Sequence, residues 1–249
     1  MREDLAVTSY ATAQRPGDRD FQCDATAVCT GSDGTRSYAL LDGVGDTPAV
    51  RSWARAAARR LARAAAGHGD AEVGLRAEYD HYAADPARTA GHDLPCAAAV
   101  VAVHVPGGLF SLAWSGDARA YLLLDGHLRL LTEDHNARRA YDGGDRNLIT
   151  ACLGEARSEE KTERLWGHPA IEYLRGPARP GPAGLGWLLL ASDGAYEPHE
   201  DADHDLAGYL TGDPHTAAEG LVDDAVRRAH ELHDPYADNA TALVARITC

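Results

Sequence analysis

Four aspartates stand at the ends of apolar, strand-like segments, where side chains can converge on one site. Asp42 follows SYALL and Asp193 follows WLLLAS, and each precedes a glycine and then sequence that leaves the sheet. Asp117 and Asp238 stand just before the segments RAYLLL and ATALVARI. Carboxylates gathered in one cleft repel, and each raises the pKa of the others unless a cation neutralises them. Because all-oxygen ligands select hard ions, the pattern favours a Mg²⁺ or Mn²⁺ site over a zinc site.

Sequence context separates these aspartates from ordinary turns. The chain has five Asp-Gly dipeptides, and such a dipeptide usually marks a hairpin turn. Asp33 and Asp125 lie between strand-like segments, so we interpret them as turns. No partnering apolar run follows Asp42 or Asp193, which makes these two the stronger functional candidates.

Two other patterns are interpreted as solvated surface. The histidine pairs 199/204 and 230/233 do not match the HExxH zinc motif, and the first lies in a charged stretch. Arginines recur every four residues in the segment 48–66, which indicates a helix face whose charges point to water; they are Arg51, Arg55, Arg59 and Arg63.

Short apolar segments bounded by turn signals predict a chain rich in strands. Strands are predicted at 5–12, 25–30, 36–41, 96–105, 109–115, 119–124, 127–132, 147–153, 186–192 and 240–247. Helices are predicted at 48–66, 70–83 and 215–233, and a Pro/Gly-rich loop at 176–186. Several strands follow one another without intervening helices, which argues against a doubly wound parallel sheet. We expect sheets with helices packed outside them.

The composition limits the classes of function. The 24 basic and 38 acidic side chains give a net charge of −14, which disfavours nucleic acid or an anionic membrane as partner. The five cysteines are scattered and fit neither a disulfide framework nor a zinc ribbon, which favours a reducing compartment. The N-terminus does not resemble a signal peptide, and the apolar runs are too short to span a bilayer. We therefore expect a cytoplasmic location.

Five motifs, in this order, resemble those of the PP2C-type, metal-dependent serine/threonine protein phosphatases. They are LLDGVG (40–45), SGDARAYLLLDGHLRLLTEDHN (115–136), RNLITACLG (146–154), LLLASDG (188–194) and DNATALVARI (238–247). They span about 200 residues, and the second motif is the most specific. The resemblance implies an α+β fold: a PP2C-like four-layer α-β-β-α sandwich, with two packed, mainly antiparallel sheets flanked by helices. Residues 1–249 would form a single PP2C-like phosphatase domain.

The resemblance also implies a set of metal ligands. Asp42 would bridge two metal ions, and the carbonyl group of Gly43 would complete one coordination shell. Asp193 and Asp238 would ligate the first metal. Asp117 matches the position that helps to hold a third, looser ion. The implied cofactors are thus two Mn²⁺ or Mg²⁺ ions, with a weaker third.

The N-terminal motif allows two alignments. In the first, Arg15 matches the arginine that holds the substrate phosphate, and Asp20 matches the acid that orients metal-held water. Arg19 then replaces a glutamate that usually helps to bind the second metal. In the second alignment, Arg19 and Asp24 take these two roles, and Cys23 replaces the glutamate. With Arg19 in place of the glutamate, the second metal site loses a carboxylate, so we expect activity to need millimolar rather than micromolar Mn²⁺.

Two further departures concern loops beside the cleft. The family's DGxGGH is DGVGDT, so Asp46 and Thr47 replace glycine and histidine. The segment between Asp134 and Arg146 is shorter than in most members, which trims the flap next to the cleft.

The resemblance implies hydrolysis of phosphoserine and phosphothreonine in proteins that are targets of Ser/Thr kinases. A hydroxide bridging the two cations would attack phosphorus in line with the leaving oxygen. No motif for a nucleophilic serine or cysteine is present, which agrees with direct attack. Two alternatives stay open: a PP2C-like pseudophosphatase or regulatory binding domain with little turnover, and a phosphohydrolase of small molecules.

Overall fold

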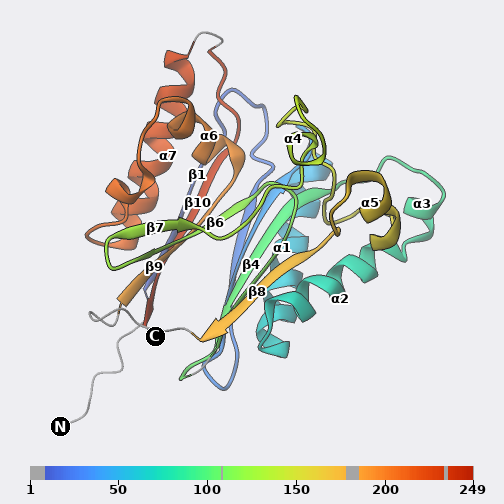
Figure 1. Cartoon of the computed structure of the whole chain (residues 1–249), viewed down its shortest axis with the longest axis horizontal. Coiled ribbons are helices and arrows are strands. Elements are labelled where there is room, and N and C mark those ends of the chain that lie inside the picture. Colours follow the sequence, from blue (N-terminus) through green and yellow to red (C-terminus); the bar gives the residue numbers. More distant parts are fainter. Residues whose placement is uncertain (1–8, 108, 178–184, 233–234, 249) are drawn as a thin grey trace.

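The computed structural model describes residues 9–107, 109–177, 185–232 and 235–248. Within these ranges two five-stranded antiparallel sheets lie face to face, and helices cover the outer side of each (Figure 1). The predicted four-layer α-β-β-α sandwich is thus confirmed.

Each sheet combines strands from distant parts of the chain. The first sheet has the order β1 (Tyr10–Arg15), β10 (Ala240–Thr248), β9 (Leu185–Ala191), β6 (Arg119–Leu124) and β7 (His127–Leu130). The second has the order β2 (Ala25–Thr30), β3 (Arg36–Gly43), β4 (Ala97–His104), β5 (Leu109–Ser115) and β8 (Glu172–Pro177). The helices are α1 (Pro48–His68), α2 (Ala71–Ala83), α3 (Pro86–Thr89), α4 (Ala137–Ala140), α5 (Glu159–Trp166), α6 (Asp193–Asp201), the 3-10 helix η1 (Leu206–Tyr209) and α7 (Pro214–Glu231).

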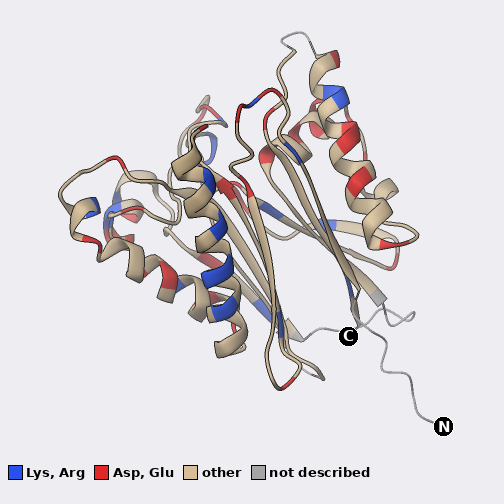
Figure 2. Cartoon of the chain, turned by 180° about the vertical axis from the view of Figure 1, so that it is seen from behind, with Lys and Arg blue, Asp and Glu red and all other residues tan. Residues whose placement is uncertain are grey.

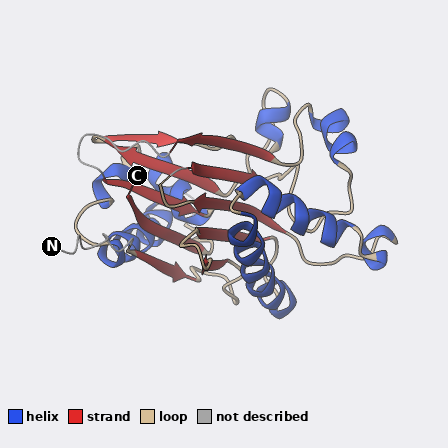
Figure 3. Ribbon diagram, turned by 90° about the horizontal axis from the view of Figure 1, so that it is seen from below, coloured by secondary structure: helices blue, strands red, loops and turns tan. Residues whose placement is uncertain are grey.

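Alternation along the strands divides the buried apolar side chains among three clusters. In β3, Leu40 points into the core between the sheets, whereas Ala39 and Leu41 pack toward α1 and α2. On the outer face of the first sheet, Leu189 and Val244 pack against α6 and α7. The helices therefore lie outside the pair of sheets, as Figures 1 and 3 show.

Helix α1 follows directly from its sequence. The hydroxyl group of Thr47 accepts the N–H of Val50 at 3.2 Å, and Pro48 occupies the first helical position. The helix ends at Gly69, whose φ of 63° is left-handed. Its buried face is mostly alanine, and Figure 2 shows basic residues in blue on the outer face: half-buried Arg51 and exposed Arg55, Arg59 and Arg63. The prediction of a solvated arginine face is confirmed.

Several sequence predictions need correction. The predicted strand 147–153 forms only two isolated bridges, Ala97 with Leu153 and Asn136 with Ile149. The reason is that β3 and β5 already pair with β4 and leave only its end free. Strand β8 and helices α5 and α6 were not predicted. The predictions at 5–8, at 178–184 and for Cys249 lie outside the described residues. In the described ranges, none of the helices has both the length and the apolar character needed to cross a membrane.

Gly43, at the end of β3, is required for close packing beneath the candidate site. A Cβ at Gly43 would lie 2.5 Å from the carbonyl oxygen of Cys23 and 2.8 Å from Val50 Cγ1. We expect Gly43→Ala to lower the free energy of unfolding by about 1–3 kcal/mol. Gly67→Ala is the matched control, because nothing lies within 4 Å of a Cβ there and the residue is inside α1. It should stabilise the protein by about 0.5–1 kcal/mol. Urea unfolding measures the stability of both variants. An equal change in the free energy of unfolding in Gly43→Ala and Gly67→Ala would contradict the close packing around Gly43.

Candidate metal centre

Asp24 and Asp42 lie opposite each other at one end of the second sheet. The antiparallel pairing of β2 with β3 aligns Ala25 with Leu41. Continuing this register by one residue places Asp24, which precedes β2, opposite Asp42. Directly opposite residues have Cβ atoms about 5 Å apart, so the two carboxylates are neighbours.

Asp193 and Asp238 come from the first sheet in the same way. Asp193 begins α6 shortly after β9, and Asp238 shortly precedes β10, the strand paired with β9. Ser192 joins the two chains: its hydroxyl donates to the carbonyl oxygen of Asn239 at 3.2 Å and accepts the N–H of Thr241 at 3.0 Å. The ends of β9 and β10 are thus held together beside the two aspartates.

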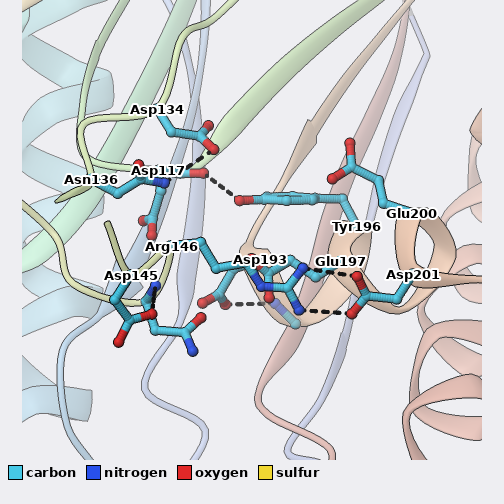
Figure 4. Close-up of polar contacts among 12 residues, drawn as sticks. Asp117, Asp134, Asn136, Asp145, Arg146, Asp193, Tyr196, Glu197, Glu200 and Asp201 are labelled. Carbon is cyan, nitrogen blue, oxygen red and sulfur yellow. Dashed lines mark hydrogen bonds and ion pairs between the residues drawn. The ribbon is translucent and has the colours of Figure 1, made fainter. Parts of the chain in front are cut away.

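Asp117 lies where the chain crosses from β5 in the second sheet to β6 in the first. Its side chain is buried, and its carbonyl oxygen accepts the hydroxyl of Tyr196 at 3.1 Å (Figure 4). The guanidinium of Arg119 lies 3.9 Å from the centre of the Tyr196 ring and also pairs with Asp134 at 2.8 Å. These contacts hold the crossover in place, which fixes Asp117 between the sheets.

The buried aspartates raise one another's pKa. Burial, together with the nearby charges of Asp193, Asp24 and Asp117, raises the pKa of Asp42 well above its ordinary range. Burial and the charge of Asp193 raise the pKa of Asp24 to about 8. Burial and the charge of Asp238 raise the pKa of Asp193. Mutual repulsion of this kind shows that the structure brings together all four aspartates predicted as metal ligands, together with Asp24.

The donor set fits hard divalent cations. Within the described residues, no hydrogen bond of normal geometry reaches either carboxylate oxygen of Asp24 or Oδ1 of Asp117, although the hydroxyl groups of Thr241 and Ser192 lie near Asp24 and act to lower its pKa. Unpaired oxygens buried among like charges are unfavourable on their own and are the ligands that Mg²⁺ and Mn²⁺ prefer. The centre is therefore suited to such ions.

Asp42, Asp193 and Asp238 line a cleft of about 740 Å³, together with Gly43, Arg19 and residues of α6, whereas Asp24 and Asp117 are buried. Arg146 reaches the cleft from the loop after α4 and pairs with Asp201 at 2.7 Å and Glu197 at 3.3 Å (Figure 4). Burial and the charge of Asp193 raise the pKa of Glu197 to about 7. Sequence analysis did not select Glu197 or Arg146 as site residues, although Arg146 opens one of the PP2C-like motifs.

Arg15 and Asp20, the first pair proposed for the N-terminal motif, are not brought to the cleft. Arg15 lies at the end of β1 and pairs with Glu219 and, at 2.7 Å, with Asp223 of α7. Asp20 is exposed and does not line the cleft. Arg15 does not reach the cleft because it is the last residue of β1 that pairs with β10. This pairing directs the Arg15 side chain toward α7.

Arg19 and Asp24, the second pair, are placed as that alignment requires. Arg19 lines the cleft and pairs with Asp238 at 2.5 Å, while Asp24 is buried among the other carboxylates. Cys23 is then the residue at the glutamate position; its side chain is buried, and its thiol contacts the carbonyl oxygen of Thr47 at 3.6 Å. The geometry favours the second alignment.

The two departures in DGVGDT have structural roles. The carboxylate of Asp46 accepts the N–H groups of Asp20 at 3.0 Å and Phe21 at 2.8 Å. Thr47 caps α1. Asp46 therefore ties the segment that carries Arg19 and Asp24 to the loop after Asp42, and Thr47 fixes the start of the helix that follows this loop.

A second set of contacts positions the Asp117 crossover from the other side. His135 accepts the N–H of Gly116 at its Nδ1, at 3.3 Å, and donates from Nε2 to Glu172 at 3.1 Å. Arg139 donates two hydrogen bonds to Glu172, at 2.7 and 2.9 Å. Burial alone would raise the pKa of Glu172, but the hydrogen bonds from Arg139 and His135 outweigh it and lower this pKa to about 2.

This network predicts an acid-sensitive contribution to stability. Because the pKa of Glu172 is lower in the folded chain than its ordinary 4.5, the contribution is complete above that pH and is lost as the pH falls toward about 2. We expect Glu172→Gln to destabilise the protein by about 2 kcal/mol at pH 7. The difference from wild type should shrink between pH 4.5 and about 2. Urea unfolding across this range tests it, with exposed Glu160→Gln as control; a difference independent of pH would contradict the assignment.

Comparison with known proteins identifies the fold. No protein-family model matches the sequence, and no curated protein matches it. Among solved structures, the chain is similar to PppA, a key regulatory component of T6SS in Pseudomonas aeruginosa, with 22% identity, 96% of each chain covered and a TM-score of 0.69. It is similar to the Mycobacterium tuberculosis serine/threonine phosphatase PstP, with 23% identity, 97% of this chain and 99% of that chain covered, and a TM-score of 0.67. It is also similar to the Staphylococcus aureus serine/threonine phosphatase Stp1, with 18% identity, 97% and 96% covered, and a TM-score of 0.68.

These similarities establish the class of structure. The chain has the fold of the bacterial PP2C-type serine/threonine phosphatases, as the sequence motifs implied. The catalytic domain of PstP has also been solved with two manganese ions, in a structure that matches this chain with 22% identity and a TM-score of 0.62.

Proposed function

We propose that this protein is a Mn²⁺- or Mg²⁺-dependent phosphatase that hydrolyses phosphoserine and phosphothreonine in proteins. The observation that carries the proposal is a cleft lined by Asp42, Asp193 and Asp238 together with Arg19. Two further aspartates, Asp24 and Asp117, are buried close enough to Asp42 for their charges to raise its pKa. Carboxylates that lie close together repel one another unless bound cations neutralise their charge. An arginine beside them can donate hydrogen bonds to the oxygens of a phosphate group.

The residues proposed to hold the cations are those of the cluster. Asp42, Asp193 and Asp238 with the carbonyl group of Gly43 would hold two ions, and Asp117 would help to hold a weaker third. When bound, the cations would lower the pKa of a water molecule and offset the charge of the substrate phosphate. The two manganese ions in the PstP structure support this proposal.

Arg19 is proposed to bind the substrate phosphate. Its guanidinium is one-third exposed, it lies beside the cluster, and Tyr236 packs against it with the ring centre 5.6 Å from Cζ. Its present partner, Asp238, is one of the proposed metal ligands, so a cation on Asp238 would leave the guanidinium free for phosphate oxygens. Asp24, deep in the cluster, is proposed to accept a hydrogen bond from the attacking water and so orient it.

The proposed substrate is a phosphorylated protein rather than a small metabolite. PstP and Stp1 are named as serine/threonine phosphatases, and this chain is similar to both over nearly its whole length. The net charge of −14 argues against nucleic acid as a partner. We also propose a cytoplasmic location, which cell fractionation would test.

The test is phosphate release with and without Mn²⁺. We expect Mn²⁺-dependent hydrolysis of an aryl phosphate and a higher kcat/KM for a phosphothreonine peptide than for small phosphate esters. A preference for the small esters would favour the metabolite phosphohydrolase. Mn²⁺ binding without turnover of any ester would favour the pseudophosphatase and contradict the proposal.

Cys23 predicts a weak second metal site. With no carboxylate at this position, we expect half-maximal activity only at about millimolar Mn²⁺. Cys23→Glu adds a ligand and should lower that concentration about tenfold. Cys23→Ser is the control because it changes the thiol without adding a carboxylate, and thermal melting checks that both variants fold. Saturation of the wild-type enzyme at micromolar Mn²⁺ would contradict the prediction.

A further inference from the structure

A second group of metal-binding side chains lies between α6, η1 and α7, away from the aspartate cluster. His199, His204 and Asp224 each offer one donor atom, and these three atoms lie within 4.8 Å of one another. The sequence analysis placed both histidines on a solvated surface. That prediction is wrong for His199, which is fully buried at the end of α6, and correct for His204, which is exposed.

The imidazole of His199 is oriented as a metal ligand. Its Nε2 lies 3.1 Å from the carbonyl oxygen of Leu221, to which only a protonated nitrogen can donate. Nδ1 therefore carries a lone pair, and this buried atom has no hydrogen-bond partner among the described residues. Burial also lowers the pKa of His199, which keeps the ring neutral. A histidine that binds a metal usually donates the N–H of one ring nitrogen to a carbonyl or carboxylate oxygen and binds the metal through the other nitrogen. His199 has this arrangement.

The other two donors are held near the His199 ring. The N–H of His204 donates to the carbonyl oxygen of His199 at 2.8 Å, and the ring centres of the two histidines lie 5.6 Å apart. Asp224 accepts the hydroxyl of Tyr209, whose ring lies beside both histidine rings, at 5.1 Å from His199 and 5.6 Å from His204. Tyr209 thus orients the carboxylate toward the histidines.

Two arginines compete for the same carboxylate. Arg228 donates to Asp224 from Nε at 2.8 Å, and Arg227 donates to its other oxygen while also pairing with Glu231 at 2.7 Å. A carboxylate offers about four lone-pair positions, so these bonds leave room for one more ligand contact. Their positive charges nevertheless weaken the binding of a cation at Asp224.

We propose that His199, His204 and Asp224 form a Zn²⁺ site that links the end of α6 to α7. Imidazole nitrogens favour Zn²⁺ and similar transition metals, whereas the all-oxygen aspartate cluster favours Mg²⁺ or Mn²⁺. Tetrahedral Zn²⁺ needs ligand atoms about 3.4 Å apart, so the exposed His204 has only a short distance to move. This site is independent of the proposed phosphatase activity.

The test measures Zn²⁺ binding by equilibrium dialysis in excess Mg²⁺, which is added to compete with Zn²⁺ for the aspartate cluster. We expect the wild-type protein to bind one more Zn²⁺ per chain than His204→Ala, and Zn²⁺ to raise the melting temperature of the wild type by several degrees but not that of the variant. His215→Ala is the matched control, because His215 is exposed on α7 and outside the cluster. It should behave as wild type. Because His204 is exposed, its replacement leaves the core intact.

The variant Arg228→Gln should strengthen Zn²⁺ binding, whereas His204→Ala should weaken it. Removing this competing charge should tighten Zn²⁺ binding about tenfold, whereas a cluster that serves only to pack the helices predicts no change. Equal Zn²⁺ stoichiometry in wild type and His204→Ala would overturn the proposal. Unchanged affinity in Arg228→Gln would overturn the assignment of Asp224 as a ligand.

Discussion

Asp193→Asn should abolish Mn²⁺-dependent phosphate release and, in the absence of metal, make the protein more stable. Asp193 interacts with both Asp42 and Asp238, so losing its charge removes a proposed metal ligand and relieves repulsion at the same time. We expect kcat/KM to fall at least about a thousandfold, which corresponds to about 4 kcal/mol. The metal-free variant should gain about 1 kcal/mol of stability, since the relief of repulsion exceeds the lost attraction to the N-terminus of α6.

Melting curves with and without Mn²⁺, together with phosphate release, test both parts. Without metal the variant should melt about 2–4 °C above wild type, and Mn²⁺ should stabilise the wild type far more than the variant. Asp203→Asn is the matched control: Asp203 is exposed in the turn after α6, and asparagine tolerates its positive φ of 52°. Full activity of Asp193→Asn would contradict the assignment of Asp193 as a metal ligand. A metal-free variant less stable than wild type would show that repulsion does not dominate there.

The four aspartates proposed as metal ligands could be selected from the sequence because each stands at a strand end and thus at an edge of a sheet. Asp42 and Asp193 follow the apolar segments from which β3 and β9 form, and Asp117 and Asp238 shortly precede the segments that form β6 and β10. The N-terminal pair was not predictable in this way. Arg15 and Asp20 have the same separation as Arg19 and Asp24, so spacing cannot choose between them.

The strand register makes that choice. Pairing of Ala25 with Leu41 places Asp24 opposite Asp42, and no local pattern in the sequence reveals which residues two strands will pair. The prediction also missed β8, because its sequence EYLRGP lacks an apolar alternation and its position depends on the free edge of β5. The charged neighbours of His199 predict a surface position, yet α6 turns this side chain, like those of Ala195 and Tyr196, toward the core, where it contacts Leu221 of α7.

Arg19→Ala should lower kcat/KM about a hundredfold, whereas Arg15→Ala should stay within about twofold of wild type. The two arginines form a matched pair because each lies near one end of the N-terminal motif and each forms ion pairs with acidic side chains. Arg15 pairs with Glu219 and Asp223 on the outside of α7, where such partly exposed pairs stabilise a protein by at most about 1 kcal/mol. Of these two arginines, only Arg19 lines the cleft. A larger loss of kcat/KM in Arg15→Ala than in Arg19→Ala would favour the first alignment of the N-terminal motif, in which Arg15 binds the phosphate.

Mn²⁺ affinity distinguishes a phosphate-binding arginine from one that only orients Asp238. Arg19 now pairs with Asp238, so its removal leaves that carboxylate to the cation and should tighten Mn²⁺ binding severalfold. Activity should fall all the same, and inorganic phosphate should become a weaker competitive inhibitor, because the guanidinium that holds the phosphate oxygens is gone. Arg19→Lys keeps the charge without the planar fork and should recover part of kcat/KM. If Arg19→Ala instead weakened Mn²⁺ binding and left phosphate inhibition unchanged, Arg19 would act through Asp238, and the phosphate would have to be bound by another group of the cleft, such as Arg146.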